Sequence, residues 1–150
     1  MKILLWILVS ACLAVVVISI SEDHQKLKDK RKKAVEECRK ENPNATEEDF
    51  SALKVKDDPK TEIQHCLFQC VYEKVGILKD GKLNKDEINK VTDIRNKHNE
   101  TLFKEEDYLS RWCQAEVEKN YAKIGKCGVA NAYHSCVGKL RATRKSHLSG

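Results

Sequence analysis

The sequence predicts an all-α domain held together by three disulfides, and three observations carry this prediction. Apolar residues recur at helical spacing over most of the chain, and almost no segment alternates in the manner of a β-strand. Six cysteines follow the first 21 residues, and an even set in a small secreted protein is typical of a disulfide framework. Residues 22–150 are enough for one domain with one core.

Residues 1–21 are expected to be a cleaved signal peptide. A single lysine precedes an almost unbroken apolar run over 3–20, and Ser19 and Ser21 supply small residues for a cleavage site. The run of 18 residues is also at the lower limit for a membrane span, so a signal anchor is the alternative. The acidic start of the next segment, at Glu22, argues against an anchor because cytoplasmic retention favours Lys or Arg there. We therefore expect a secreted, extracellular protein without stable membrane insertion.

The first two helices are predicted from one apolar face and one capping signal. Pro43 ends the first helix. Thr46 to Asp49 resembles a capping box that opens a short second helix through Phe50 and Leu53. The apolar face of the first helix consists of Leu27, Ala34, Val35 and Cys38.

The third helix has the clearest apolar face of the chain. It is predicted to start at Asp58-Pro59, because proline suits a first helical turn, and to stop at Gly76. Cys66 and Cys70 are one turn apart on it, so their side chains point the same way, and a regular helix does not offer disulfide geometry between them. Each is expected to reach a different partner, although six cysteines allow 15 pairings. The face consists of Ile63, Cys66, Leu67, Cys70, Val71 and Val75.

Three more helices follow, the first of them capped by Asn84. Each is predicted from apolar residues at helical spacing. The fourth carries Ile88, Val91 and Ile94; the fifth carries Leu109, Trp112, Cys113, Val117 and Tyr121; the sixth carries Ala130, Tyr133, Val137 and Leu140.

The cysteine spacing on six predicted helices behind a leader resembles that of the insect odorant-binding protein family. Three residues separate Cys66 from Cys70, a long interval follows, and eight residues separate Cys127 from Cys136. The stretch from Gly76 to Gly81 is similar to the turn found after the third helix in that family. The resemblance covers the whole of residues 22–150. It implies the pairing Cys38 with Cys70, Cys66 with Cys127 and Cys113 with Cys136.

The resemblance also implies a compact six-helix bundle around an internal apolar cavity, which carries a small hydrophobic ligand such as an odorant or pheromone through aqueous fluid. Such a cavity needs apolar walls and a few polar groups that orient the ligand. Tyr121 and Tyr133 are the expected hydroxyl anchors. An olfactory receptor is a further expected partner, and the oligomeric state is expected to be monomer or homodimer. The expected lining consists of Leu53, Ile63, Leu67, Val71, Ile88, Ile94, Trp112, Val117, Tyr121, Tyr133 and Val137.

The charge pattern keeps two other functions open. Charged residues form 34% of the chain, and removal of Lys2 from 28 basic residues leaves 27 against 23 acidic residues, a formal net charge of +4. Six of the eight residues from Lys26 to Lys33 are basic. Because a secreted protein has little access to nucleic acid, this run favours an anionic membrane or an acidic partner, or else a solvated helix face. The alternatives to an odour carrier are thus a cationic effector at membrane surfaces and a scavenger of lipids or amines.

Catalysis and metal binding find little support in the sequence. No His-Asp pair lies on a cysteine-bearing helix, and cysteines in disulfides supply neither a nucleophile nor zinc ligands. The segment after Asp80 has the glycine and closing glutamate of a calcium loop, but Gly76 and Leu78 would then occupy ligand positions without offering a side-chain oxygen. We expect no enzyme activity, no metal and no cofactor.

Two further sets of residues are candidates for regulation and modification. His65 and His98 could weaken ligand binding in acid, because histidine changes charge between pH 5 and 8. Asn44 and Asn99 stand in acceptor triplets for N-linked sugar.

Overall fold

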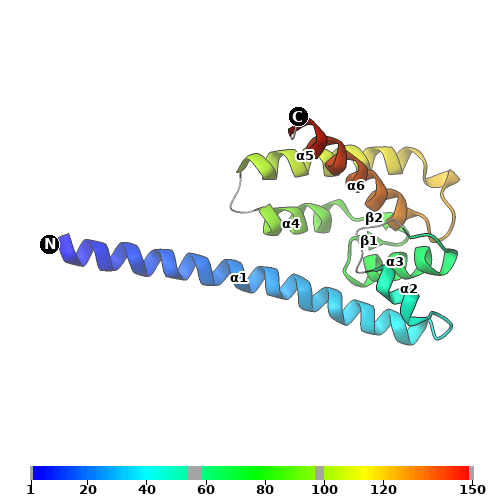
Figure 1. The fold of residues 1–150 in the computed structure, drawn as a ribbon, viewed down its shortest axis with the longest axis horizontal. Coiled ribbons are helices and arrows are strands. Elements are labelled where there is room, and N and C mark those ends of the chain that lie inside the picture. Colours follow the sequence, from blue (N-terminus) through cyan, green and yellow to red (C-terminus); the bar gives the residue numbers. More distant parts are fainter. Residues whose placement is uncertain (1, 54–58, 97–99, 149–150) are drawn as a thin grey trace.

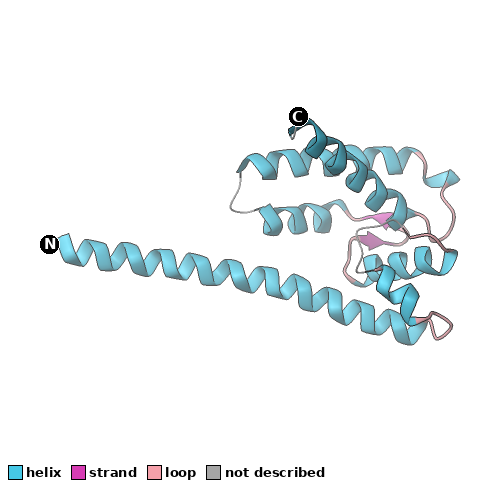
Figure 2. Cartoon of the chain, in the orientation of Figure 1, coloured by secondary structure: helices cyan, strands magenta, loops and turns pink. Residues whose placement is uncertain are grey.

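The computed structural model describes the backbone of residues 2–53, 59–96 and 100–148, and the side chains of residues 22–53, 59–96 and 100–143. Helices dominate the chain, as the sequence predicts, and one small β-hairpin interrupts them (Figure 2). The elements in chain order are α1 (Lys2–Glu41), α2 (Glu47–Ala52), α3 (Glu62–Lys74), β1 (Leu78–Lys79), β2 (Lys82–Leu83), α4 (Lys85–Asn96), α5 (Glu100–Lys119), the 3-10 helix η1 (Tyr121–Lys123) and α6 (Val129–Leu148).

The long helix α1 lies along one side of the bundle. Its N-terminal half extends beyond the other elements, while its C-terminal half packs with α3 and α4 (Figure 1). The helix includes residues 2–21 of the predicted leader and runs on without a break into the domain. Among the residues whose side chains are described, no helix is long and apolar enough to cross a membrane.

Side-chain caps set the starts of α2 and α3. Thr46 accepts a hydrogen bond from the Asp49 amide, and the Asp49 carboxylate accepts one from the Thr46 amide, which confirms the predicted capping box. The predicted start of α3 at Pro59 is wrong, because Thr61 is the N-cap and its hydroxyl accepts from the Gln64 amide at 3.2 Å. A hydroxyl cap outweighed the preference of proline for a first turn.

A β-hairpin with a two-residue turn follows α3. Gly76 adopts a φ of 83° just after the helix, and Asp80 and Gly81 turn the hairpin with φ values of 53° and 72°. Positive φ at both central residues matches the primed turns that join antiparallel strands, for which Asp-Gly is a preferred sequence. Strands of two residues are too short to produce an alternating pattern, so the sequence did not reveal them.

Three disulfides tie the helices together. Cys38–Cys70 joins α1 to α3, Cys66–Cys127 joins α3 to the segment before α6, and Cys113–Cys136 joins α5 to α6. This is the pairing that the family resemblance implied. Four of these six cysteines lie within α1, α3 and α5. The disulfides therefore hold together helices that are far apart in the sequence.

The core lies where α3 meets α1, α2 and α6, and where α5 meets α6. The all-α prediction with three disulfides is confirmed. One element differs: Tyr121 was expected at the end of the fifth helix, but α5 ends at Lys119 and Tyr121 starts η1. The Tyr121 hydroxyl accepts a hydrogen bond from the Leu83 amide at 2.9 Å, which ties η1 to the hairpin. The largest fully buried side chains are Leu67, Cys38 and Cys113.

Candidate ligand pocket

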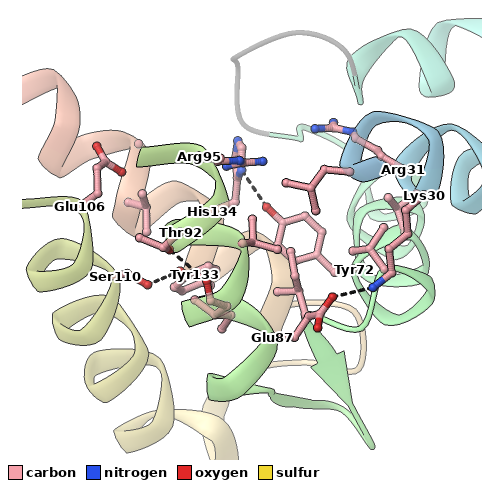
Figure 3. A pocket seen from close by; sticks show the side chains of 18 of the residues that line it. Lys30, Arg31, Tyr72, Glu87, Thr92, Arg95, Glu106, Ser110, Tyr133 and His134 are labelled. Carbon is pink, nitrogen blue, oxygen red and sulfur yellow. Dashed lines mark hydrogen bonds and ion pairs between the residues drawn. The ribbon is translucent and has the colours of Figure 1, made fainter. Parts of the chain in front are cut away.

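One cavity of about 200 Å³ lies between five helices and is partly open to solvent (Figure 3). Helices α1, α3, α4, α5 and α6 all contribute to its wall. The volume is below the roughly 300–1,000 Å³ of pockets for drug-sized ligands, so it suits a smaller molecule. Its lining consists of Leu27, Lys30, Arg31, Val71, Tyr72, Val75, Ile77, Glu87, Ile88, Val91, Thr92, Arg95, Glu106, Ser110, Tyr133, His134, Val137, Gly138 and Arg141.

Aliphatic side chains form one part of the wall. They come from each of the elements around the cavity except α5, and two of them, Val71 and Ile88, are almost fully buried. An aliphatic wall of this kind favours an apolar ligand because binding removes apolar surface of both partners from water. The aliphatic set is Leu27, Val71, Val75, Ile77, Ile88, Val91 and Val137.

Hydroxyl groups form a second part of the wall. The oxygens of Ser110 and Tyr133 lie 2.8 Å apart, and Gln114 donates to Ser110 at 3.1 Å. Burial raises the pKa of Tyr133, and the Ser110 hydrogen bond opposes that rise. Burial also raises the pKa of Tyr72 to about 12. Both phenols are therefore neutral at physiological pH, and each hydroxyl has a hydrogen-bond partner in the structure, Ser110 for Tyr133 and His134 for Tyr72.

Charged groups form the third part. Lys30 Nζ lies 2.5 Å from Glu87 Oε1 and bridges α1 to α4. Arg141 binds the Glu106 carboxylate with two nitrogens, Nε at 2.8 Å and Nη2. These pairs place a carboxylate beside two of the four cations that line the cavity.

A family model described as the PBP/GOBP family matches residues 20–139. The chain belongs to this family of insect odorant-binding proteins. Among curated proteins and among solved structures, no match was found. The PBP/GOBP family consists of secreted proteins that bind small hydrophobic ligands.

Four residues expected to contact a PBP/GOBP ligand lie together at the cavity: Val71, Ile88, Tyr133 and Val137. The others lie elsewhere. Leu53, Leu67 and Val117 are buried in the core, while Ile94 and Tyr121 are half-buried outside the lining.

The expectation that Ile63 and Trp112 face inward is wrong, since each is 45% exposed. The reason is helical rotation. Cys113 is fully buried on α5, and the preceding residue is turned by about 100°, which brings Trp112 to the surface. On α3, Leu67 is fully buried, whereas Ile63 one turn earlier lies in the first turn, at the exposed end of the helix.

Sequence reasoning missed the charged and hydroxyl-bearing lining because it followed apolar residues alone. The stripe of α6 through Tyr133 and Val137 continues to Arg141 at the same spacing of four. Likewise, Lys30 and Arg31 stand three and four residues after Leu27. If each apolar face had been extended by one helical turn, it would have included Arg141 on α6 and Lys30 and Arg31 on α1.

His65 and Asn44, the two candidates for regulation and modification within the described residues, are not part of the cavity lining. His65 Nε2 is 3.0 Å from the Pro59 carbonyl oxygen, and His65 is absent from the lining. His98 and Asn99 lie outside the described residues. Asn44 is exposed, so its side chain is accessible to a glycosylating enzyme. The histidine that does line the cavity is His134.

Proposed function

We propose that this PBP/GOBP protein is an extracellular carrier that binds a small hydrophobic ligand, such as an odorant or pheromone, and moves it through aqueous fluid. The single observation that carries the proposal is the cavity of about 200 Å³ with aliphatic and hydroxyl-bearing walls. Membership of a family of binding proteins supports it.

The leader is part of the same proposal. The family match begins at residue 20, close to the proposed cleavage after residue 21. Sequencing of the N-terminus of protein secreted by insect cells tests it: a start near Glu22 supports cleavage, whereas retention of residues 1–21 in the membrane fraction favours the signal anchor.

Displacement of a naphthylamine dye by alcohols, esters and carboxylic acids tests ligand binding. The intrinsic fluorescence of Trp112 is a poor reporter because that side chain lies at the surface. Affinities in the micromolar range, about -8 kcal/mol, are expected for a carrier. If no apolar ligand displaces the dye and none binds by calorimetry, the carrier function is wrong.

Gly138 offers a matched pair of variants for this test. It lines the cavity, and a Cβ added there meets no atom within 4 Å. Gly138→Ala should bind as the parent does, and removal of a mid-helix glycine should stabilise α6 by up to about 1 kcal/mol. Gly138→Trp has a side chain large enough to enter the cavity, and it should weaken binding of every ligand. Equal binding by both variants would place the ligand elsewhere.

The cationic effector is the second candidate, and one observation favours it: Lys28, Lys32 and Lys33 are exposed on α1. Lys30 is unsuited to a test of this function because it also lines the cavity and pairs with Glu87. Lys28→Glu combined with Lys32→Glu should leave dye displacement unchanged in a carrier. Loss of vesicle binding together with loss of activity, in a protein that binds no apolar ligand, would favour the effector.

A further inference from the structure

Within the part of the chain whose side chains are described, two of the four cations around the cavity have no carboxylate partner. Lys30 pairs with Glu87, and Arg141 pairs with Glu106. Arg31 donates through Nη2 to the Leu53 carbonyl oxygen at 2.6 Å, which leaves its charge unneutralised. Arg95 forms no side-chain hydrogen bond or ion pair within residues 22–53, 59–96 and 100–143. The lining therefore carries four cationic and two anionic side chains, an excess of two positive charges.

The unpaired charges gather at one end of the cavity. Figure 3 shows Arg95 and Arg31 on the side towards which the Tyr72 hydroxyl points. Arg31, Arg95 and Arg141 each act electrostatically on Tyr72, and Arg31 and Arg141 act on Arg95. Burial lowers the pKa of Arg95, and repulsion from Arg141 lowers it further. Arg95 and Arg31 are also open to solvent, so an anion can reach this end and would relieve that repulsion.

Another part of the wall is aliphatic, through Val71, Val75, Ile88 and Val91. One cavity thus joins a cationic end to an apolar surface. Guanidinium groups bind planar carboxylates with two parallel hydrogen bonds, and such charge-assisted bonds are stronger than neutral ones.

We propose that the ligand is an amphiphile with an anionic head, a fatty carboxylate being the simplest case, whose head is bound by Arg95 and Arg31 while its tail lies on the aliphatic wall. This inference rests on the proposed carrier function and narrows the class of ligand. It separates the protein from a carrier of neutral alcohols and esters, and also from a scavenger of amines, whose cationic heads the same end would repel.

Dye displacement with decanoate, decanol and decylamine at pH 7.5 tests the inference, because the three probes share one tail. Decanoate should bind on the order of tenfold more tightly than decanol, as expected for hydrogen bonds to a charged group, and decylamine should bind least. Added salt should weaken the binding of decanoate and leave the binding of decanol unchanged.

Three variants locate the effect. Arg95→Gln should lower the affinity for decanoate to the affinity for decanol. The matched control is Lys32→Gln, which removes the same charge from an exposed position of α1 outside the lining and should leave all three affinities unchanged. Glu106→Gln removes a carboxylate from the lining and should strengthen decanoate binding, a gain that misfolding would not produce.

The outcomes distinguish the inference from the function on which it rests. If decanol binds as tightly as decanoate in the parent, or if Arg95→Gln and Lys32→Gln behave alike, the anionic head is wrong and the carrier function stands. If none of the three probes binds, the carrier function fails as well.

Discussion

The hydroxyl of Tyr72 lies 3.1 Å from Nδ1 of His134 and joins α3 to α6 beside the cavity. Phe68 contacts the same imidazole edge-on, with ring centroids 5.3 Å apart, and its own ring lies 6.2 Å from that of Tyr72. Two aromatic residues one turn apart on α3 therefore hold the His134 ring in one orientation. Both the stability of this contact and the charge of its imidazole are open to measurement.

Tyr72→Phe should destabilise the protein by about 1 kcal/mol, because it removes one hydrogen bond and preserves the ring. Urea unfolding monitored by circular dichroism measures the change. Tyr108→Phe is the matched control, since Tyr108 is 67% exposed and its loss should change stability by less than about 0.5 kcal/mol. Equal effects of the two substitutions would mean that the Tyr72 contact contributes nothing.

Acid should weaken the binding of a neutral ligand and should act through His134 rather than His65. Protonation of an imidazole in the lining adds a positive charge, and a charged group favours water over an apolar molecule. For decanoate the sign reverses, because the added charge attracts the carboxylate. The ionisable groups that surround His134 in the lining are Lys30, Arg31, Tyr72, Glu87, Arg95, Glu106, Tyr133 and Arg141.

Affinity for decanol and decanoate, titrated from pH 7.5 to 5, checks the prediction. His134→Gln should abolish the opposite trends of the two ligands, whereas His65→Gln, which lies outside the lining, should keep them. A pH dependence that survives in His134→Gln would identify another group as the sensor.

The capping box of α2 should make stability depend on pH in acid. Hydrogen bonds from the amide and hydroxyl of Thr46 hold the pKa of Asp49 below its ordinary value. The unfolded chain therefore takes up this proton at a higher pH than the folded protein does. The contribution is complete above about pH 4 and is lost as pH falls through the lower folded-state pKa.

Thermal unfolding at pH 6 and pH 3 measures this effect. Asp49→Asn should show a smaller fall in melting temperature between the two pH values than the parent does. Asp86→Asn, in the first turn of α4, should fall as the parent does, because Asp86 forms no hydrogen bond with the described residues. Thr46→Ala should cost about 1 kcal/mol at pH 6.

Loss of the Cys66–Cys127 disulfide should destabilise the protein more than loss of Cys113–Cys136. The two bonds close loops with sequence separations of 61 and 23 residues, and loop entropy alone gives a difference of about 0.9 kcal/mol. Paired alanine substitutions measure each cost, with about 2–5 kcal/mol expected for either bond. Peptide mapping without reduction checks the pairing itself, and a bond between Cys66 and Cys70 would contradict the fold.

The order of helices could be predicted from sequence because each has a local signal. Asn84 caps α4 through its side-chain oxygen, which accepts from the Glu87 amide, and Gly76 follows α3 with positive φ, both as the residue types indicate. The hairpin could not be predicted, since four strand residues carry too little pattern.

The cavity was harder to predict because a helix face does not reveal whether it meets another helix or an empty space. Leu67 and Val71 lie one turn apart on the same face of α3, yet Leu67 packs in the core and Val71 reaches the cavity. Trp112 shows a different error. It was expected to face inward because it is large and apolar, yet it is exposed beside the buried Cys113. The charged lining was missed for a different reason. Arg95 belongs to a charged cluster only because α1, α3 and α6 bring Arg31, Tyr72 and Arg141 near it, and the sequence of α4 alone does not show this.

Of the five helices around the cavity, α4 alone contains no cysteine. It supplies Glu87, Ile88, Val91, Thr92 and Arg95 to the lining. It is held in place by packing, by the ion pairs of Lys30 with Glu87 and of Lys85 with Glu118, and by a contact of His24 Nε2 with the Ile94 carbonyl oxygen at 2.8 Å. The other four helices are cross-linked in pairs, α1 to α3 by Cys38–Cys70 and α5 to α6 by Cys113–Cys136. Because no disulfide restrains α4, we expect it to be the wall of the cavity that opens most readily. Amide hydrogen exchange should be fastest in α4 among these five helices and should slow most there when the cavity is filled.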